Sequence, residues 1–169
     1  MSQIRRYYWD SSVFCSYFNQ EPGRADIVDD LLQEAVAGKS EIITSSFSLV
    51  EVVKLKNTTP ITAKQEEQLE AFFEYPCIKI VNADRGVCER ARQLVWKYGL
   101  KPKDAVHVAT AEFAAKIVII HELFSWDSDF TKLNGKIPTI PFDLREPYMK
   151  QPLLKLEDVD APPPEDGGR

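Results

Sequence analysis

Four acidic residues occupy positions at which carboxylates could act together. Asp10 directly follows the apolar run "YYW", and Asp127 directly follows "LFSW". Glu51 lies inside the apolar run "LVEVV", and Asp104 begins the small-residue segment "DAVHVATAEFAA". Carboxylates gathered in one cleft repel each other unless a cation or protons intervene. Oxygen ligands suit Mg²⁺ or Mn²⁺, and an ion held by a few carboxylates and waters is suited to phosphoryl transfer.

Each acid also has a simpler structural explanation. Asp10 could be a helix N-cap, and Asp104 could favour the positive end of a helix dipole. Asp127 and Asp129 could shape a turn through their side chains. Glu51 must be either exposed or paired, because an unpaired carboxylate is costly to bury. The four positions together, each beside or within a regular element, favour a shared site.

Strand-like and helix-like segments alternate along the chain, as expected of an α/β domain with a mainly parallel sheet. Parallel strands end on one edge of such a sheet, so Asp10 and Asp127 should share that edge, and Asp104 could face it. The expected strands are 4–9, 41–46, 77–82, 123–126 and 137–142, and the expected helices are 13–19, 24–37, 46–56, 62–75, 84–98 and 103–116.

The composition indicates one globular domain followed by an acidic end. The chain has 169 residues, of which 44% are hydrophobic and 28% are charged, and its net charge is −5. Residues 157–169 carry five acids and one arginine, a net of −4, so the residues before them carry a net of only −1. This charge shows no obvious nucleic-acid footprint, and a polyanionic substrate would need local basic patches or a bound cation.

Sequence features also bear on the cellular setting. No apolar stretch approaches the roughly 18 residues of a membrane span, and the first residues do not form a signal-peptide pattern. Cys15, Cys77 and Cys88 are far apart and have no zinc-ligand spacing. We therefore expect a cytoplasmic protein whose cysteines are buried thiols.

The order of the motifs "WDSSVF", "SSFSLVEVV", "LKPKDAVHVATAEFAA" and "FSWDSDF" resembles the PIN-domain family, and within it the VapC-like toxins. The resemblance covers about 4–147, and the last two motifs are the most specific. It implies a three-layer α/β/α domain over 1–150 that acts as a ribonuclease dependent on Mg²⁺ or Mn²⁺. Residues 151–169 would form a separate Pro-rich tail, which we expect to be disordered.

The resemblance also assigns roles to individual residues. Asp10, Glu51, Asp104 and Asp127 match the family's catalytic and metal-binding acids. Supporting positions are matched by Ser12, Ser125 and Asp129, and flanking lysines that could contact RNA phosphates are Lys54, Lys56, Lys101 and Lys103. A metal-activated water would then attack the phosphodiester.

Three aromatic or imidazole residues lie close to these acids in the sequence. His107 falls near the same helical face as Asp104, and either a structural hydrogen bond or a general-base role is open to it. Trp9 and Trp126 each precede an acid and are expected in the core of the sheet rather than as base-stacking platforms.

The biological role stays open between three alternatives. The chain could be the toxin of a toxin–antitoxin pair, inhibited by a small antitoxin protein, or an RNA-processing nuclease without such a partner. It could also be a PIN-like module that binds RNA or protein without turnover, although the presence of all four acids disfavours this. The family resemblance further implies a homodimer.

Overall fold

The computed structural model describes residues 4–52 and 60–149, and within them five strands form one sheet. The strands are β1 (Arg5–Trp9), β2 (Ser40–Ser45), β3 (Ile78–Val81), β4 (Glu122–Phe124) and β5 (Asp143–Arg145). The helices are α1 (Ser11–Phe18), α2 (Ala25–Val36), α3 (Ser48–Glu51), α4 (Ala63–Phe73), α5 (Arg85–Tyr98), α6 (Pro102–Ala115) and α7 (Ser128–Thr131).

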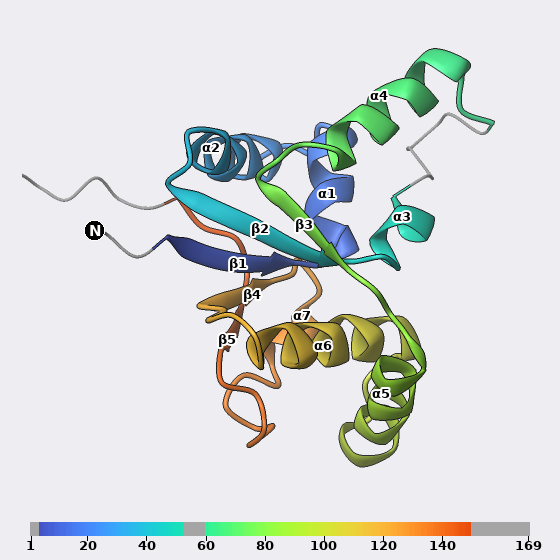
Figure 1. Ribbon diagram of the computed structural model, residues 1–169, viewed down its shortest axis with the longest axis vertical. Helices are drawn as coiled ribbons and strands as arrows, with labels where there is room; N and C mark the ends of the chain where they lie inside the picture. Colours follow the sequence, from blue (N-terminus) through green and yellow to red (C-terminus); the bar gives the residue numbers. More distant parts are fainter. Residues whose placement is uncertain (1–3, 53–59, 150–169) are drawn as a thin grey trace, which may run out of the picture.

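The strand order is β3-β2-β1-β4-β5, and every neighbouring pair is parallel. The chain first builds outward from β1 through β2 to β3, then returns to the other side of β1 with β4 and β5 (Figure 1). The order therefore reverses between β1 and β4. In open α/β sheets, ligands bind beyond the carboxyl ends of the strands at such a reversal.

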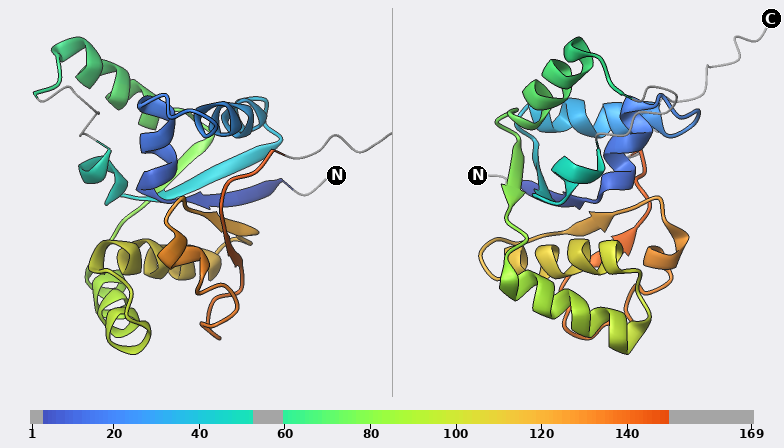
Figure 2. Two further views of the ribbon diagram at one scale, coloured as in Figure 1. Left: turned by 180° about the vertical axis from the view of Figure 1, so that it is seen from behind. Right: turned by 90° about the vertical axis from the view of Figure 1, so that its right-hand side faces the viewer.

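Helices cover both faces of the sheet, which confirms the expected three-layer α/β/α arrangement (Figures 1 and 2). Successive strand residues face opposite layers, as the pleat requires. Tyr7 and Trp9 pack with α1, α2 and α4, whereas Tyr8 packs with α5 and α6. Ile42 and Ile43 divide between the two layers in the same way. Since both faces are buried, the strands read as continuous apolar runs rather than alternating ones.

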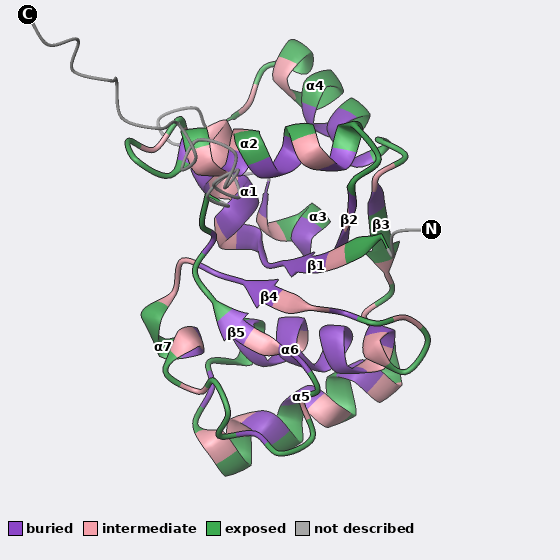
Figure 3. Cartoon of the chain, turned by 90° about the vertical axis from the view of Figure 1, so that its left-hand side faces the viewer, coloured by how far each residue is buried: buried purple, intermediate pink, exposed green. Residues whose placement is uncertain are grey.

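Helix α6 lies between the sheet and α5, and it is buried along much of its surface (Figure 3). Its small side chains explain how it fits there. Ala105, Ala109 and Ala111 are fully buried and allow close approach of the helix to both neighbours. This placement fixes the orientation of the acid in its first turn, Asp104.

The boundaries of several helices follow their capping residues. Thr62 and Gln65 form the expected capping box at the start of α4. Gly99 ends α5 in the left-handed conformation, with φ of +69°, as expected of a helix stop. Helix α1 begins at residue 11, two residues earlier than the expected 13–19, because Asp10 caps it.

Some sequence-based boundaries were wrong. The last strand lies at 143–145 and not at 137–142. Ile137 and Phe142 are buried against α5 and α6, but Pro138 and Pro141 in this segment have no N–H to donate to a ladder. In the described part of the expected helix over 46–56, only Ser48–Glu51 is helical, so the expectation was too long there. Residues 53–59 lie outside the described residues.

The thiols are less buried than expected. None of the three cysteines is bonded to another, but Cys88 is exposed, and Cys15 and Cys77 are partly buried. Burial raises the pKa of Cys15 to about 11. None of the helices in the described part of the chain is both long and apolar enough to cross a membrane.

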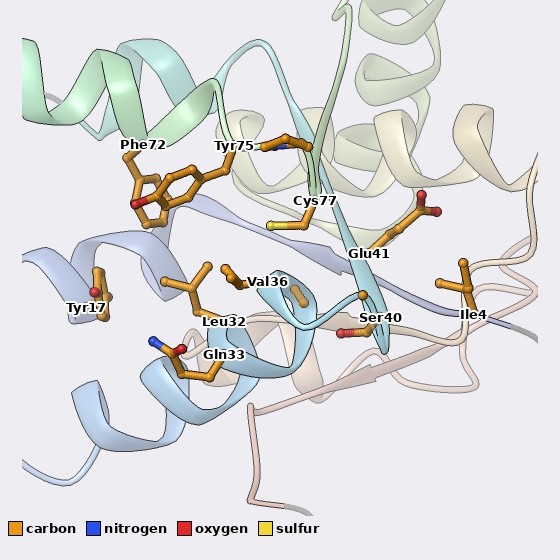
Figure 4. Close-up of a pocket in the computed structure, with 13 residues that line it drawn as sticks. Ile4, Tyr17, Leu32, Gln33, Val36, Ser40, Glu41, Phe72, Tyr75 and Cys77 are labelled. Carbon is orange, nitrogen blue, oxygen red and sulfur yellow. The ribbon is translucent and has the colours of Figure 1, made fainter.

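A pocket of about 610 Å³ opens at the amino end of the sheet (Figure 4). Ile4 and Ser40 border it from the starts of β1 and β2, and Tyr17 and Phe72 border it from α1 and α4. The site acids follow the carboxyl ends of the strands, so this pocket lies at the opposite end of the sheet.

Candidate active site at the strand reversal

Asp10 and Asp127 follow β1 and β4, the two strands between which the strand order reverses. The strand ends are joined by hydrogen bonds across the reversal. The backbone N–H of Asp10 donates to the carbonyl of Phe124 at 3.1 Å. The hydroxyl of Ser12 donates to Asp10 Oδ1 at 2.6 Å and accepts from the Trp126 backbone N–H at 2.9 Å. Ser12 thus connects Asp10 directly to the segment that carries Asp127.

Asp10 is a helix cap and a buried carboxylate at once. Its Oδ1 accepts from the backbone N–H groups of Ser12 and Val13 at 2.9 and 3.3 Å, which caps α1. The residue is 4% exposed. Burial raises the pKa of Asp10, while the charge of His107 and the hydroxyl of Ser12 oppose that rise. The simpler explanation, a cap, is therefore correct, but it accounts for only one carboxylate oxygen.

Asp104 lies in the first turn of α6, and its Oδ2 is buried without a hydrogen-bond partner among the described residues. Burial raises the pKa of Asp104 to about 6, and the negative charges of Asp127 and Asp10 add to this effect. Lys103 and Lys101 act in the opposite direction. An unpartnered buried oxygen beside two further carboxylates is an arrangement that a cation would relieve.

Glu51, the last residue of α3, is held by a buried hydrogen-bond network. The hydroxyl of Ser11 donates to Glu51 Oε2, and His107 Nε2 lies 2.8 Å from the same oxygen. His107 Nε2 also lies 2.9 Å from Ser11 Oγ, and its Nδ1 hydrogen bonds with the Tyr8 hydroxyl at 3.0 Å. Burial alone would raise the pKa of Glu51, but the hydrogen bonds from His107 and Ser11 lower it. Glu51 is thus a positioned carboxylate.

Asp127 caps α7 by accepting from the Asp129 backbone N–H at 2.9 Å. Its own N–H donates to Ser125 Oγ at 3.0 Å, which shows how Ser125 supports this position. Lys101 Nζ lies 3.2 Å from a carboxylate oxygen of both Asp127 and Asp129. Lys101 and Lys132 lower the pKa of Asp129.

Of the four lysines expected to contact RNA phosphates, the structure describes two, and both lie beside acidic residues. Lys101 pairs with Asp127, and Lys103 Nζ lies 3.8 Å from Glu51 Oε1, so both act as counter-charges to the site acids. Lys54 and Lys56 lie outside the described residues. Asp127 and Glu51 are therefore partly neutralised by the protein's own cations.

The two tryptophans differ from each other. Trp9 is 1% exposed and belongs to the core, as expected. Trp126 follows β4, is only partly buried and packs against the edge of the same core, so its expected place in the core is confirmed in part. Its indole N–H donates to Ser16 Oγ at 2.9 Å, and the Arg24 guanidinium lies 4.8 Å from its ring centroid.

The residues fit a divalent cation in part. Within 4–52 and 60–149, no three acidic, histidine or cysteine side chains already converge as a complete metal site. Mg²⁺, however, commonly keeps several waters and binds only one or two protein carboxylates. The unpartnered Oδ2 of Asp104 and the mutual repulsion of Asp104, Asp10 and Asp127 suit such an ion.

Spacing does not single out Ser11 as a site residue. Ser11 and Ser12 are adjacent hydroxyls, and only the direction of the helix decides that Ser12 contacts Asp10 while Ser11 contacts Glu51. His107 could be placed near Asp104 on helical spacing, but its contact with Glu51 joins residues 56 positions apart. The structure shows the hydrogen-bonded histidine, the simpler of its two alternatives.

Three solved structures resemble the chain at 18–22% identity, which shows a shared fold. One is VapBC2 from Rickettsia felis bound to a DNA fragment from its promoter, at 18% identity and a TM-score of 0.55, covering 82% of this chain and 98% of that one. Another is a toxin–antitoxin complex from Klebsiella pneumoniae, at 22% identity and 0.55, covering 85% and 99%.

A third is VapC20 from Mycobacterium tuberculosis, a sarcin–ricin loop cleaving toxin, at 18% identity and a TM-score of 0.59, covering 75% of this chain and 93% of that one. No curated protein matches the chain. A family model described as "PIN domain" matches residues 7–136, which include all four site acids. The chain belongs to the PIN domain family.

Proposed function

We propose that this protein is an endoribonuclease that uses Mg²⁺ or Mn²⁺ to hydrolyse RNA phosphodiester bonds. The observation that carries the proposal is Asp104, whose buried Oδ2 has no partner in the described chain and whose pKa is raised to about 6. A carboxylate kept in this state is destabilising unless a ligand compensates it. Its place beside Asp10 and Asp127 at the strand reversal matches a ligand-binding position of α/β sheets.

In the proposed site, Asp104, Asp10 and Asp127 would hold the ion, and Glu51 would lie at its edge. When bound, a divalent ion supplies an acidified water and stabilises charge on the phosphate. His107 and Ser11 fix the Glu51 carboxylate through Oε2, so its other oxygen, Oε1, faces Lys103. Glu51 is then placed to orient a water by accepting a hydrogen bond from it.

Lys101 and Lys103 have a second role in this proposal. The side chains of both are more than half exposed, and each lies within ion-pair distance of a site acid. A cation that neutralises the acids would release these ammonium groups, which could then contact substrate phosphates. This explains how an acidic protein with a net charge of −5 could hold RNA.

The proposed biological role is that of a toxin inhibited by a small antitoxin protein. Its support is the likeness of the fold to a toxin–antitoxin complex, to VapBC2 bound to a promoter DNA fragment and to the sarcin–ricin loop cleaving toxin VapC20. The homodimer, the cytoplasmic location and the division at 150/151 remain predictions.

The test is cleavage of a mixed structured RNA pool by purified protein with Mg²⁺ or Mn²⁺, and again with EDTA. Asp10→Asn should keep the cap of α1, because asparagine is a good N-cap, while removing the charge. Asp84→Asn makes the same change at the cap of α5 and is the matched control. We expect cleavage by the wild type and Asp84→Asn only with metal, and none by Asp10→Asn.

Cleavage that survives both EDTA and Asp10→Asn would refute the proposal. If no sample cleaves RNA, the proposed turnover is wrong for this pool, and a PIN-like binding module becomes the better description. A shift of the melting temperature with Mg²⁺ would then show whether the acids still bind a cation.

A further inference from the structure

The segment that leads into the site has a charge opposite to that of the whole chain. Residues 85–103 contain six basic residues and one acid, whereas the full chain has 26 acidic and 21 basic residues. This segment comprises α5 and the start of α6. The basic residues are Arg85, Arg90, Arg92, Lys97, Lys101 and Lys103, and the acid is Glu89.

Four of the six have acidic partners that account for them. Arg85 pairs with Glu89, and Arg90 forms two hydrogen bonds with the buried Glu112. Lys101 and Lys103 pair with the site acids. Arg92 and Lys97 form no ion pair with any residue in the described ranges, and each instead lies over an aromatic ring.

Arg92 and Lys97 stack on Trp96 and Tyr98 at the end of α5. The Arg92 guanidinium lies 5.0 Å from the centroid of the Trp96 ring, and Lys97 Nζ lies 5.4 Å from that of Tyr98. Trp96 is 73% exposed, more than any other aromatic residue in the described part of the chain. We call these four residues the α5 basic–aromatic patch.

The patch is close to the proposed site along the chain. Only residues 99–101 separate the end of α5 from the first residue of α6, and Asp104 is in the first turn of that helix. The right-hand view of Figure 2 shows that α5 ends on the same side of the domain as α7, which Asp127 caps. An α-helix is about 10–12 Å across, so a single RNA strand could pass from the site acids to the outer face of α5 within a few nucleotides.

An exposed indole with a stacked guanidinium and a neighbouring ammonium matches the chemistry of single-stranded RNA. Bases stack on aromatic rings whatever their sequence, and cations neutralise the backbone beside them. A single exposed apolar residue would need no explanation. The combination of an exposed ring with two cations that have no acidic partner among the described residues does need one.

We infer that the α5 basic–aromatic patch binds single-stranded RNA next to the cleaved bond, with a base stacked on Trp96 and phosphates at Arg92 and Lys97. The inference rests on the proposed ribonuclease function and adds a substrate-binding surface to it. The patch would thereby favour substrates with an unpaired segment beside the scissile phosphodiester.

The test is the affinity for a short fluorescent single-stranded RNA, measured by anisotropy with Mg²⁺ in an Asp104→Asn background that does not cleave. Trp96→Ala should weaken binding about tenfold, as expected for one lost base stack. Trp96→Phe should restore most of that affinity, because it keeps a ring. Tyr75→Ala, at another exposed aromatic remote from α5, is the matched control and should have no effect.

The two cations have a separate readout. Arg92→Ala combined with Lys97→Ala should reduce the slope of log affinity against log salt by about 1.4, since each phosphate contact on a single strand contributes about 0.7. In cleavage assays with an active Asp104, Trp96→Ala should raise KM and leave kcat unchanged.

An RNA affinity of Trp96→Ala equal to that of the unsubstituted background would overturn the inference. A loss of affinity in Trp96→Phe and in Tyr75→Ala as large as that in Trp96→Ala would also overturn it. The failure of the proposed function has a different signature, namely absence of metal-dependent cleavage by the wild-type protein. RNA binding that depends on Trp96 without any cleavage would keep the patch and reject the nuclease. Metal-dependent cleavage with the same KM in wild type and Trp96→Ala would keep the nuclease and reject the patch.

Discussion

Replacing Asp104 by asparagine should stabilise the metal-free protein at neutral pH, although it removes a residue of the proposed site. The side chain is 4% exposed, and its Oδ2 has no partner in the described chain. Asparagine has nearly the same shape but no charge. It therefore removes the cost of burying a carboxylate without opening a cavity.

The size and sign of the effect follow from the pKa. The pKa of Asp104 is raised, chiefly by burial, from 3.8 to about 6 in the folded protein. Well below pH 3.8 the carboxyl is neutral in both states and costs nothing. As the pH rises from about 4 to about 6, the unfolded chain ionises first, so the fold loses stability, and above about pH 6 the loss is complete.

A difference of about two pKa units corresponds to about 3 kcal/mol. Water near the carboxylate screens the charge, so we expect about 1–3 kcal/mol. For a domain of this size, each kcal/mol shifts the melting temperature by about 2–4 °C.

The assay is urea denaturation of wild type and Asp104→Asn in EDTA, at pH 7.5 and again at pH 4. The variant should be more stable at pH 7.5, and most of this gain should disappear at pH 4. Saturating Mg²⁺ should then stabilise the wild type more than the variant, because only the wild type offers the full set of ligands. Asp84→Asn, an exposed cap outside the site, is the control and should show no gain.

A variant that is less stable than wild type at pH 7.5 would refute the reasoning, because Asp104 would then be paired and not strained. An equal gain at both pH values would also refute it, since the effect would not come from ionisation.

Three further predictions concern packing and positioning. His107→Ala should lower the free energy of unfolding by about 2–4 kcal/mol in urea denaturation, because its partners Glu51 and Tyr8 each lose a hydrogen bond. Any cleavage activity should fall by more than the unfolded fraction explains. Leu94→Ala, at a fully buried position of α5, should cost about 2–5 kcal/mol through the cavity it leaves, whereas a cost under about 1 kcal/mol would mean that the layer repacks freely. Thr62→Ala should cost about 1 kcal/mol through loss of the capping box, and serine at the same position should retain it, as measured by thermal melting.

The layered fold could be predicted from the sequence because local patterns carried it. The runs that form β1 and β2 are apolar on both faces, and the alternation with helices requires a parallel sheet. The last strand could not be placed in this way. Ile137 and Phe142 are apolar and buried, as residues of a strand would be. Two prolines in that segment cannot donate backbone hydrogen bonds, and residues 143–145 pair with β4 instead.

The positions of the acids could also be predicted, because each lies within or directly after a strand or helix that the sequence pattern indicates. Their hydrogen-bond and ion-pair partners could not be predicted. Glu51 reaches His107 across 56 residues, and Lys101 reaches Asp127 across 26. Such contacts depend on how helices pack on the sheet, which periodicity alone does not specify. The same applies to the unpartnered Oδ2 of Asp104, whose burial depends on the close packing of the alanine-rich α6.

The pairing of β1 with β4 has a consequence for how the protein matures. Tyr8 lies beside Leu123 in the sheet, so two strands more than 110 residues apart in the chain must meet before Asp10 and Asp127 come together. Contacts of such high contact order form late, because the closure of a long loop must precede them. A chain still emerging from the ribosome, or one cleaved before β4, would hold Asp10 and Glu51 without Asp127. The proposed site would then be complete only after this long-range pairing has formed.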